Sequence, residues 1–168
     1  MAYSRKGAVL GIDAENQESS PQQTPAMRAL EDRPVNRKVV LSGLWVAMLF
    51  LYAYVDIFSF FRADVLNGAL QGRVPVADVA IDQQFLVLAT VYILIPALMV
   101  VASLLLPARL NRWVNIAVSA VYAASVVSLA VGDPWAYYVL GSVAEVVLLV
   151  AIAWLAWTWP RTAQAVGR

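Results

Sequence analysis

The sequence of 168 residues contains no cysteine and no histidine. Without cysteine the chain has no disulfide framework, no thiol nucleophile, no iron–sulfur ligand and no thiol redox chemistry. Zinc, copper and haem sites draw mainly on histidine or cysteine, and histidine is also the commonest general base in enzymes. We therefore predict no metal site, no cofactor and no catalytic residue set.

Charged residues are scarce as well. They make up 14% of the chain and the formal net charge is +1, so nothing indicates binding to nucleic acid. Hydrophobic residues account for 61%, whereas soluble domains are nearer roughly 45–50% apolar. The excess is concentrated in blocks that are each close to the ~20 residues needed to cross ~30 Å of hydrocarbon. The four predicted spans are residues 39–61, 85–106, 113–131 and 135–159.

The links between the spans define the fold class. Residues 107–112 and 132–134 are so short that the spans they join must be antiparallel neighbours. The chain is therefore predicted to be an all-α membrane protein, an antiparallel bundle of four transmembrane helices. The longer link, residues 62–84, is amphipathic and leaves two alternatives open: a short interfacial helix that Pro75 ends, or a flexible loop.

Two polar tails flank the predicted transmembrane domain, residues 39–159. Residues 1–38 contain a run, 15–25, whose only apolar residues are prolines, and this composition predicts a disordered tail. A short helical turn is expected within this tail over residues 26–32. Residues 160–168 are predicted to form a second, shorter tail.

Basic residues are distributed unevenly between the two sides of the predicted bundle. One side carries only Arg62 and Arg73, together with several aspartates. The basic residues of the other side are Arg28, Arg33, Arg37, Lys38, Arg109, Arg112, Arg161 and Arg168. Because arginine and lysine favour the cytoplasmic side of multi-pass proteins, both termini are predicted to be cytoplasmic.

The last predicted span contains one carboxylate, Glu145, near its middle. A charged side chain at that depth costs roughly 2.5–3.5 kcal/mol even on insertion scales. No lysine or arginine lies in the same segment to offset this cost. Glu145 is therefore expected to face the protein interior, where hydroxyl groups can hydrogen-bond it or where it is protonated.

The other spans place polar side chains at nearly the same level as Glu145. A rise of about 1.5 Å per residue puts Tyr52, Tyr92, Tyr122 and Glu145 about 11 to 15 Å below the outer ends of their helices. Polar faces of membrane helices point toward one another because lipid cannot satisfy them. The sequence thus predicts a polar pocket that opens toward the outer face. Its candidate residues are Glu145, Asp56, Tyr52, Tyr92, Tyr122, Tyr138 and Ser142.

Simpler alternatives stay open for these residues. The tyrosines can be packing or interface residues, and a carboxyl group can merely tie helices together. Asp56 can instead reach outward to water or to Arg62. Pro96 is expected to kink its helix near the middle and to free a backbone carbonyl toward the core.

Several short elements resemble a known family. They are Tyr54-Val-Asp56-Ile-Phe-Ser59, Ile95-Pro96, Asn111-Arg-Trp-Val-Asn-Ile116, and Tyr137-Tyr138 with the segment that continues through Glu145 to Ala153-Trp154. Together they resemble an uncharacterised family of small four-helix prokaryotic integral membrane proteins, a domain of unknown function. The resemblance covers about residues 39–159 and implies a multi-pass protein of a prokaryotic plasma membrane. The layout is also loosely similar to DoxX-type proteins, although no diagnostic motif is shared.

Three classes of function remain open. We favour a non-catalytic subunit or binding protein whose polar pocket holds a lipid, a small apolar ligand or a partner helix. One alternative is a proton-linked transporter or channel that acts as an oligomer through Glu145. A membrane enzyme on an apolar substrate is the second alternative, and the absence of a nucleophile or cofactor motif makes it the least favoured. The expected partners are the lipid bilayer and either another membrane protein or further copies of the chain.

Overall fold

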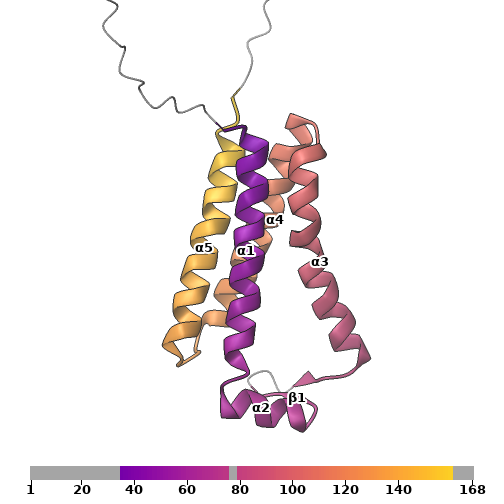
Figure 1. Ribbon diagram of the computed structural model, residues 1–168, viewed down its shortest axis with the longest axis vertical. Helices are drawn as coiled ribbons and strands as arrows, with labels where there is room; N and C mark the ends of the chain where they lie inside the picture. The colour runs from indigo at the N-terminus through magenta and orange to yellow at the C-terminus, as the bar shows by residue number, and fades with distance from the viewer. Residues whose placement is uncertain (1–34, 76–78, 161–168) are drawn as a thin grey trace, which may run out of the picture. The chain divides into compact units, whose positions relative to one another are not determined.

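The computed structural model describes residues 35–75 and 79–160. In this part of the chain, four long helices are each long and apolar enough to cross a membrane (Figure 1). They are α1 (Arg37–Ser59), α3 (Gln83–Leu105), α4 (Ala108–Ala130) and α5 (Ala136–Trp157). The predicted four-helix, all-α membrane architecture is confirmed. The predicted tail over residues 1–34, its helical turn and residues 161–168 lie outside the described residues.

Two of the helices begin at side-chain caps. The Asn36 side-chain oxygen accepts a hydrogen bond from the Lys38 amide at 2.9 Å, which satisfies one of the free donors at the start of α1. Residues 37–38, assigned to the tail from sequence, therefore belong to the helix. The Asp82 carboxylate accepts a bond from the Phe85 amide at 2.8 Å in the same way, so α3 starts at Gln83.

The start of α4 differs most from the prediction. The sequence places the third span from Trp113, whereas α4 begins at Ala108, directly after Pro107. Arg109 and Arg112 lower the hydropathy of this stretch but do not oppose helix formation, and proline is well tolerated where a helix begins. The link between α3 and α4 is therefore much shorter than the sequence suggested.

The link between α1 and α3 contains regular structure. Its short helix, α2 (Ala63–Leu70), confirms the helical alternative, although the helix ends well before Pro75. An antiparallel pair of two-residue strands follows, β1 (Arg73–Val74) and β2 (Val79–Ala80). The sequence did not predict these strands, because two residues are too few to show an alternating pattern.

The four long helices pack as antiparallel neighbours. Helix α5 lies against both α1 and α4, and α3 contacts α1 and α4. Figure 1 shows α3 close to α1 near the start of α1 and diverging from it toward α2. The most buried large side chains, each at most 1% exposed, occupy the half where the helices are close: Leu41, Trp45, Met48, Leu149 and Ile152. This half of the bundle is therefore closed.

One end of the bundle is basic, and we call the end that carries Arg37, Lys38, Arg109 and Arg112 the basic end. Arg37 donates to the Thr158 carbonyl at 2.6 Å, and Lys38 donates to the Leu106 carbonyl at 2.8 Å. Both cations thus satisfy carbonyls that the last turns of α5 and α3 leave free. Because Arg37 contacts Thr158, the start of α1 and the end of α5 lie on the same side.

Candidate functional site

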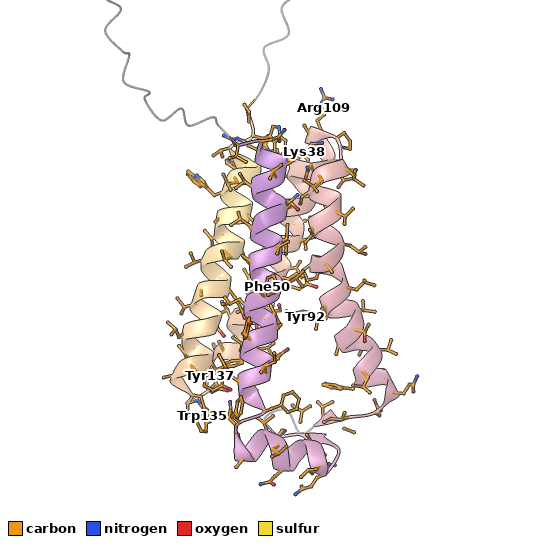
Figure 2. The ribbon with its side chains drawn as sticks, in the orientation of Figure 1. Lys38, Phe50, Tyr92, Arg109, Trp135 and Tyr137 are labelled. Atoms are coloured by element: carbon orange, nitrogen blue, oxygen red, sulfur yellow. The ribbon has the colours of Figure 1, made fainter. Side chains whose placement is uncertain are left out.

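A cavity of about 100 Å³ lies among the four long helices, beyond the closed half of the bundle. We call it the polar cavity, and it is lined by Tyr52, Val55, Asp56, Tyr92, Val126, Leu129, Tyr138 and Glu145. A smaller hollow of about 60 Å³ adjoins it between α1 and α3, and shares Tyr52, Asp56 and Tyr92 with it. Figure 2 shows Tyr92 projecting from α3 toward α1. Five of the seven predicted pocket residues therefore line one cavity.

Glu145 is the most enclosed polar group of this cavity. It is only 4% exposed, on the face of α5 that also buries Gly141 and Leu149 one turn to either side. No other described residue forms a hydrogen bond or an ion pair with its carboxyl group. Of the two alternatives for Glu145, hydrogen bonding by hydroxyl groups is not met in the described part of the chain, and protonation stays a prediction.

The hydroxyl groups bond to one another instead. The Tyr52 and Tyr92 hydroxyl oxygens lie 2.7 Å apart, and the Tyr92 and Ser125 oxygens lie 2.6 Å apart. The rings of Tyr92 and Tyr122 are stacked, with their centroids separated by 4.7 Å. The tyrosines thus form a layer that ties α1, α3 and α4 together beside the carboxyl groups.

Tyr122 joins this layer through a backbone carbonyl. Its hydroxyl donates to the carbonyl of Tyr92, four residues before Pro96. In a regular helix the amide of residue 96 would bond to that carbonyl, but proline has no amide hydrogen. The prediction that Pro96 frees a carbonyl toward the core is confirmed, and Tyr122 satisfies it. Tyr122 itself lines the smaller hollow rather than the polar cavity.

Asp56 lies in the cavity for which it was predicted, whereas Ser142 does not. Asp56 is exposed and lines both the polar cavity and the smaller hollow. It has no ion pair with Arg62, which bonds to Asp64 and Asp133 instead. Ser142 lies in a separate apolar groove of about 320 Å³ between α4 and α5, so the structure does not bring it to the polar cavity.

A buried arginine holds together the end of the bundle opposite the basic end. Arg62 is 6% exposed, and its guanidinium lies 2.7 Å from the Asp64 carboxylate and 3.2 Å from that of Asp133. It also stacks over the Trp135 ring at 4.8 Å. The bond from Arg62 holds the pKa of Asp64 below its ordinary value. This site was not predicted, because the sequence alone does not distinguish an arginine that follows a span from an ordinary solvated charge.

The closed half contains a second polar cluster that sequence reasoning also missed. The Trp45 indole donates to the Asn115 side-chain oxygen at 2.7 Å, and the Asn115 amide group donates to the Asn111 side chain at 2.6 Å. Asn111 in turn donates to the Ser103 carbonyl at 2.6 Å. All four residues are 0% exposed. The signal was present in the sequence as two asparagines four residues apart in a helix.

The chemistry of the polar cavity is that of binding through hydrogen bonds. In the described segments, 35–75 and 79–160, no group of three or more acidic, histidine or cysteine side chains could hold a metal ion. The carboxyl oxygens of Asp56 and Glu145 are available as acceptors, and aromatic rings and aliphatic side chains surround them. Such a site fits a small group that donates hydrogen bonds.

Four apolar helices around an intramembrane cavity define a small multi-pass membrane protein. The chain belongs to DUF6326, a family of unknown function whose model matches residues 27–166. The predicted membership of an uncharacterised family is thereby confirmed, and the family assigns no activity. No curated protein and no solved structure matches the chain. The prokaryotic origin and the DoxX-like layout stay predictions.

Proposed function

We propose that this protein is a non-catalytic membrane binding protein whose polar cavity holds a small ligand. The observation that carries the proposal is Glu145, a residue that is 4% exposed and lines the polar cavity, and whose carboxyl oxygens are not enclosed and have no hydrogen-bond partner among the described residues. Buried polar groups in folded proteins are almost always hydrogen-bonded, because leaving one unsatisfied is costly. A ligand that donates to Glu145 accounts for its position.

The lining of the cavity indicates the chemistry of this ligand. Carboxyl oxygens accept hydrogen bonds, so the ligand presents a hydroxyl, amide or amine group to Glu145 and Asp56. The remaining walls are the rings of Tyr52 and Tyr92 and the side chains of Val126 and Leu129, which favour an apolar body. A cavity of about 150 Å³ holds a benzene molecule, so the part of the ligand that enters is small.

The closed half of the bundle supports binding over transport. Trp45, Met48 and Asn115 are each 0% exposed and lie between the polar cavity and the basic end. A proton-linked transporter requires a path that reaches both sides of the membrane. The cavity is a dead end in the described part of the chain, which favours a binding protein over the transporter alternative.

The test is to identify what co-purifies with the full chain in mild detergent. Native mass spectrometry compares the wild-type chain with Glu145→Gln, which changes one acceptor oxygen of the cavity into a donor group. Asp64→Asn is the matched control, because it removes a carboxylate outside the cavity. We expect a bound small molecule in the wild-type chain and the control, and at least a tenfold lower occupancy in Glu145→Gln.

Three outcomes would contradict the proposal. They are a wild-type cavity that carries no small molecule, an unchanged set of bound species in Glu145→Gln, and an equal loss in both variants. A protein that co-purifies with the wild-type chain and is lost in Glu145→Gln would assign the cavity to a side chain of a partner helix instead.

A further inference from the structure

The four basic side chains of the basic end differ in their hydrogen-bond partners. Arg37 and Lys38 are bonded to the carbonyls that end α5 and α3. Arg109 and Arg112, in the first turns of α4, have no hydrogen bond or ion pair with any residue that the structure describes. Figure 2 shows Arg109 at the same end as Lys38, beyond the last turn of α3. Two guanidinium groups therefore have no counter-charge among the described residues.

Arg112 is nevertheless held in a defined place. Its guanidinium carbon lies 5.4 Å from the centroid of the Trp113 ring and 5.1 Å from that of the Trp157 ring. Aromatic faces attract cations at such distances, so one ring from α4 and one from α5 fix the group. The contact leaves the N–H donors unsatisfied: the Nε atom is buried without a partner, while the two terminal nitrogens are not enclosed.

The described segments, 35–75 and 79–160, supply no acid at this end. The acidic residues of the described segments lie at the opposite end or in the middle of the helices: Asp56, Asp64, Asp82, Asp133 and Glu145. No described acid balances Arg112, so its guanidinium is open to an anion that approaches from the membrane surface. A guanidinium offers parallel N–H donors that match two oxygens of one phosphate group.

The surroundings of Arg112 indicate where this phosphate comes from. Trp113 and Trp157 are 59% and 57% exposed, and they lie at the ends of helices that can span a membrane. Tryptophan rings at such positions sit at the level of the lipid headgroups. Lipid phosphates occupy the same level, and basic pockets between helices bind anionic headgroups there.

We propose that Arg112, held between Trp113 and Trp157 and assisted by Arg109, binds the phosphate headgroup of an anionic phospholipid. The acyl chains of this lipid lie along the exposed apolar sides of α4 and α5. The site is separate from the polar cavity and does not depend on the function proposed for it.

The experiment measures lipid binding to the full chain. Native mass spectrometry of the detergent-solubilised protein counts bound phosphatidylglycerol as this lipid is titrated, with phosphatidylcholine as the uncharged comparison. We expect Arg112→Gln to weaken phosphatidylglycerol binding at least tenfold and Trp157→Leu to weaken it several-fold. Arg73→Gln is the charge-matched control at the opposite end, in β1, and is expected to bind like the wild-type chain.

The arms of the experiment separate the alternatives. Inorganic phosphate at millimolar concentration should not displace the lipid, and displacement would assign the site to free phosphate instead. Equal affinity for the two lipids, or unchanged phosphatidylglycerol binding in Arg112→Gln, would overturn the proposal. If Arg112→Gln does not fold, Trp157→Leu and Arg109→Gln decide the result: unchanged binding in both would overturn the proposal, and weakened binding would support it.

Discussion

Pro96 removes one backbone hydrogen bond from α3, because proline has no amide hydrogen. The carbonyl group that loses its donor is bonded instead by a side chain of α4. The carbonyl of Tyr92 would accept from residue 96 in a regular helix, and it accepts from the Tyr122 hydroxyl instead. A proline in a membrane helix is tolerated when its freed carbonyl finds such a partner. At the scale of the residue, Pro96 in α3 and Tyr122 in α4 are thus coupled through one carbonyl group.

This coupling can be measured with a double-mutant cycle. Tyr122→Phe leaves the Tyr92 carbonyl unsatisfied and is expected to lower the free energy of unfolding by about 1 kcal/mol. In the Pro96→Ala background the alanine amide can bond to that carbonyl, so the same substitution should cost less. Unfolding equilibria in mixed detergent micelles give the four values. Equal effects of Tyr122→Phe in both backgrounds would show that the two residues act independently.

The sequence predicted which residues line the polar cavity better than it predicted their hydrogen-bond partners. It placed Glu145 inside the bundle and grouped it with Tyr52, Tyr92 and Asp56, since polar side chains at one depth must meet. It did not find that Tyr92 would bond to Ser125 and leave Glu145 without a hydroxyl partner. The choice depends on the rotation of each helix about its axis, which spacing along the chain does not determine.

A glycine sets how closely α1 and α5 approach. A Cβ atom added at Gly141 would lie 2.5 Å from a methyl carbon of Val55, which is closer than two carbon atoms can approach. Val55 is β-branched and has little freedom to turn away in a helix. At the scale of the element, Gly141 therefore brings the two helices together at one wall of the polar cavity, which Val55 lines.

We expect Gly141→Ala to lower the free energy of unfolding by about 1–3 kcal/mol, because the added methyl group overpacks the contact with Val55. Gly43→Ala is the matched control: a Cβ atom at Gly43, also within a helix, would meet nothing within 4 Å. It should raise the free energy of unfolding by about 0.5–1 kcal/mol through the higher helix propensity of alanine. Unfolding midpoints that move in the same direction for both variants would contradict this account.

The boundaries of the elements were less predictable than their existence. Long apolar runs identify spans because their length must match the bilayer, and each predicted span coincides with a helix over most of its length. The start of α4 was predicted too late, because the polar residues of its first turns read as a link. Hydropathy indicates which residues contact the lipid chains. A helix can extend beyond these residues into the headgroup region, because its backbone hydrogen bonds remain satisfied there.

At the scale of the whole molecule, the described segments carry their charges unevenly between the two ends of the bundle. The basic end carries Arg37, Lys38, Arg109 and Arg112, whereas Asp64, Asp82 and Asp133 lie at the opposite end. Arg37 also joins the start of α1 to the end of α5, so both described ends of the bundle lie on one side. The positive-inside rule then predicts that this side is cytoplasmic.

The absence of cysteine makes this orientation simple to test, since one introduced cysteine is the only thiol in the chain. Gln71→Cys and Ala108→Cys place it at exposed positions near the two ends of the bundle. With a membrane-impermeant maleimide on intact cells, we expect labelling of Gln71→Cys and labelling of Ala108→Cys only after permeabilisation. The reverse pattern would invert the orientation, and labelling of both without permeabilisation would exclude four complete crossings.

The membrane class, the four spans and the isolated carboxylate follow from the sequence alone. Each depends on the length of an apolar run or on the residue type at one position, and both are properties of the chain itself. Only the tertiary structure decided which polar groups have partners and which do not. It joined Tyr122 to the carbonyl freed by Pro96, left the Glu145 carboxyl group without a donor among the described residues, and placed Arg112 between two tryptophans. These outcomes depend on the rotation and depth of each helix relative to its neighbours, which packing determines once the helices have formed.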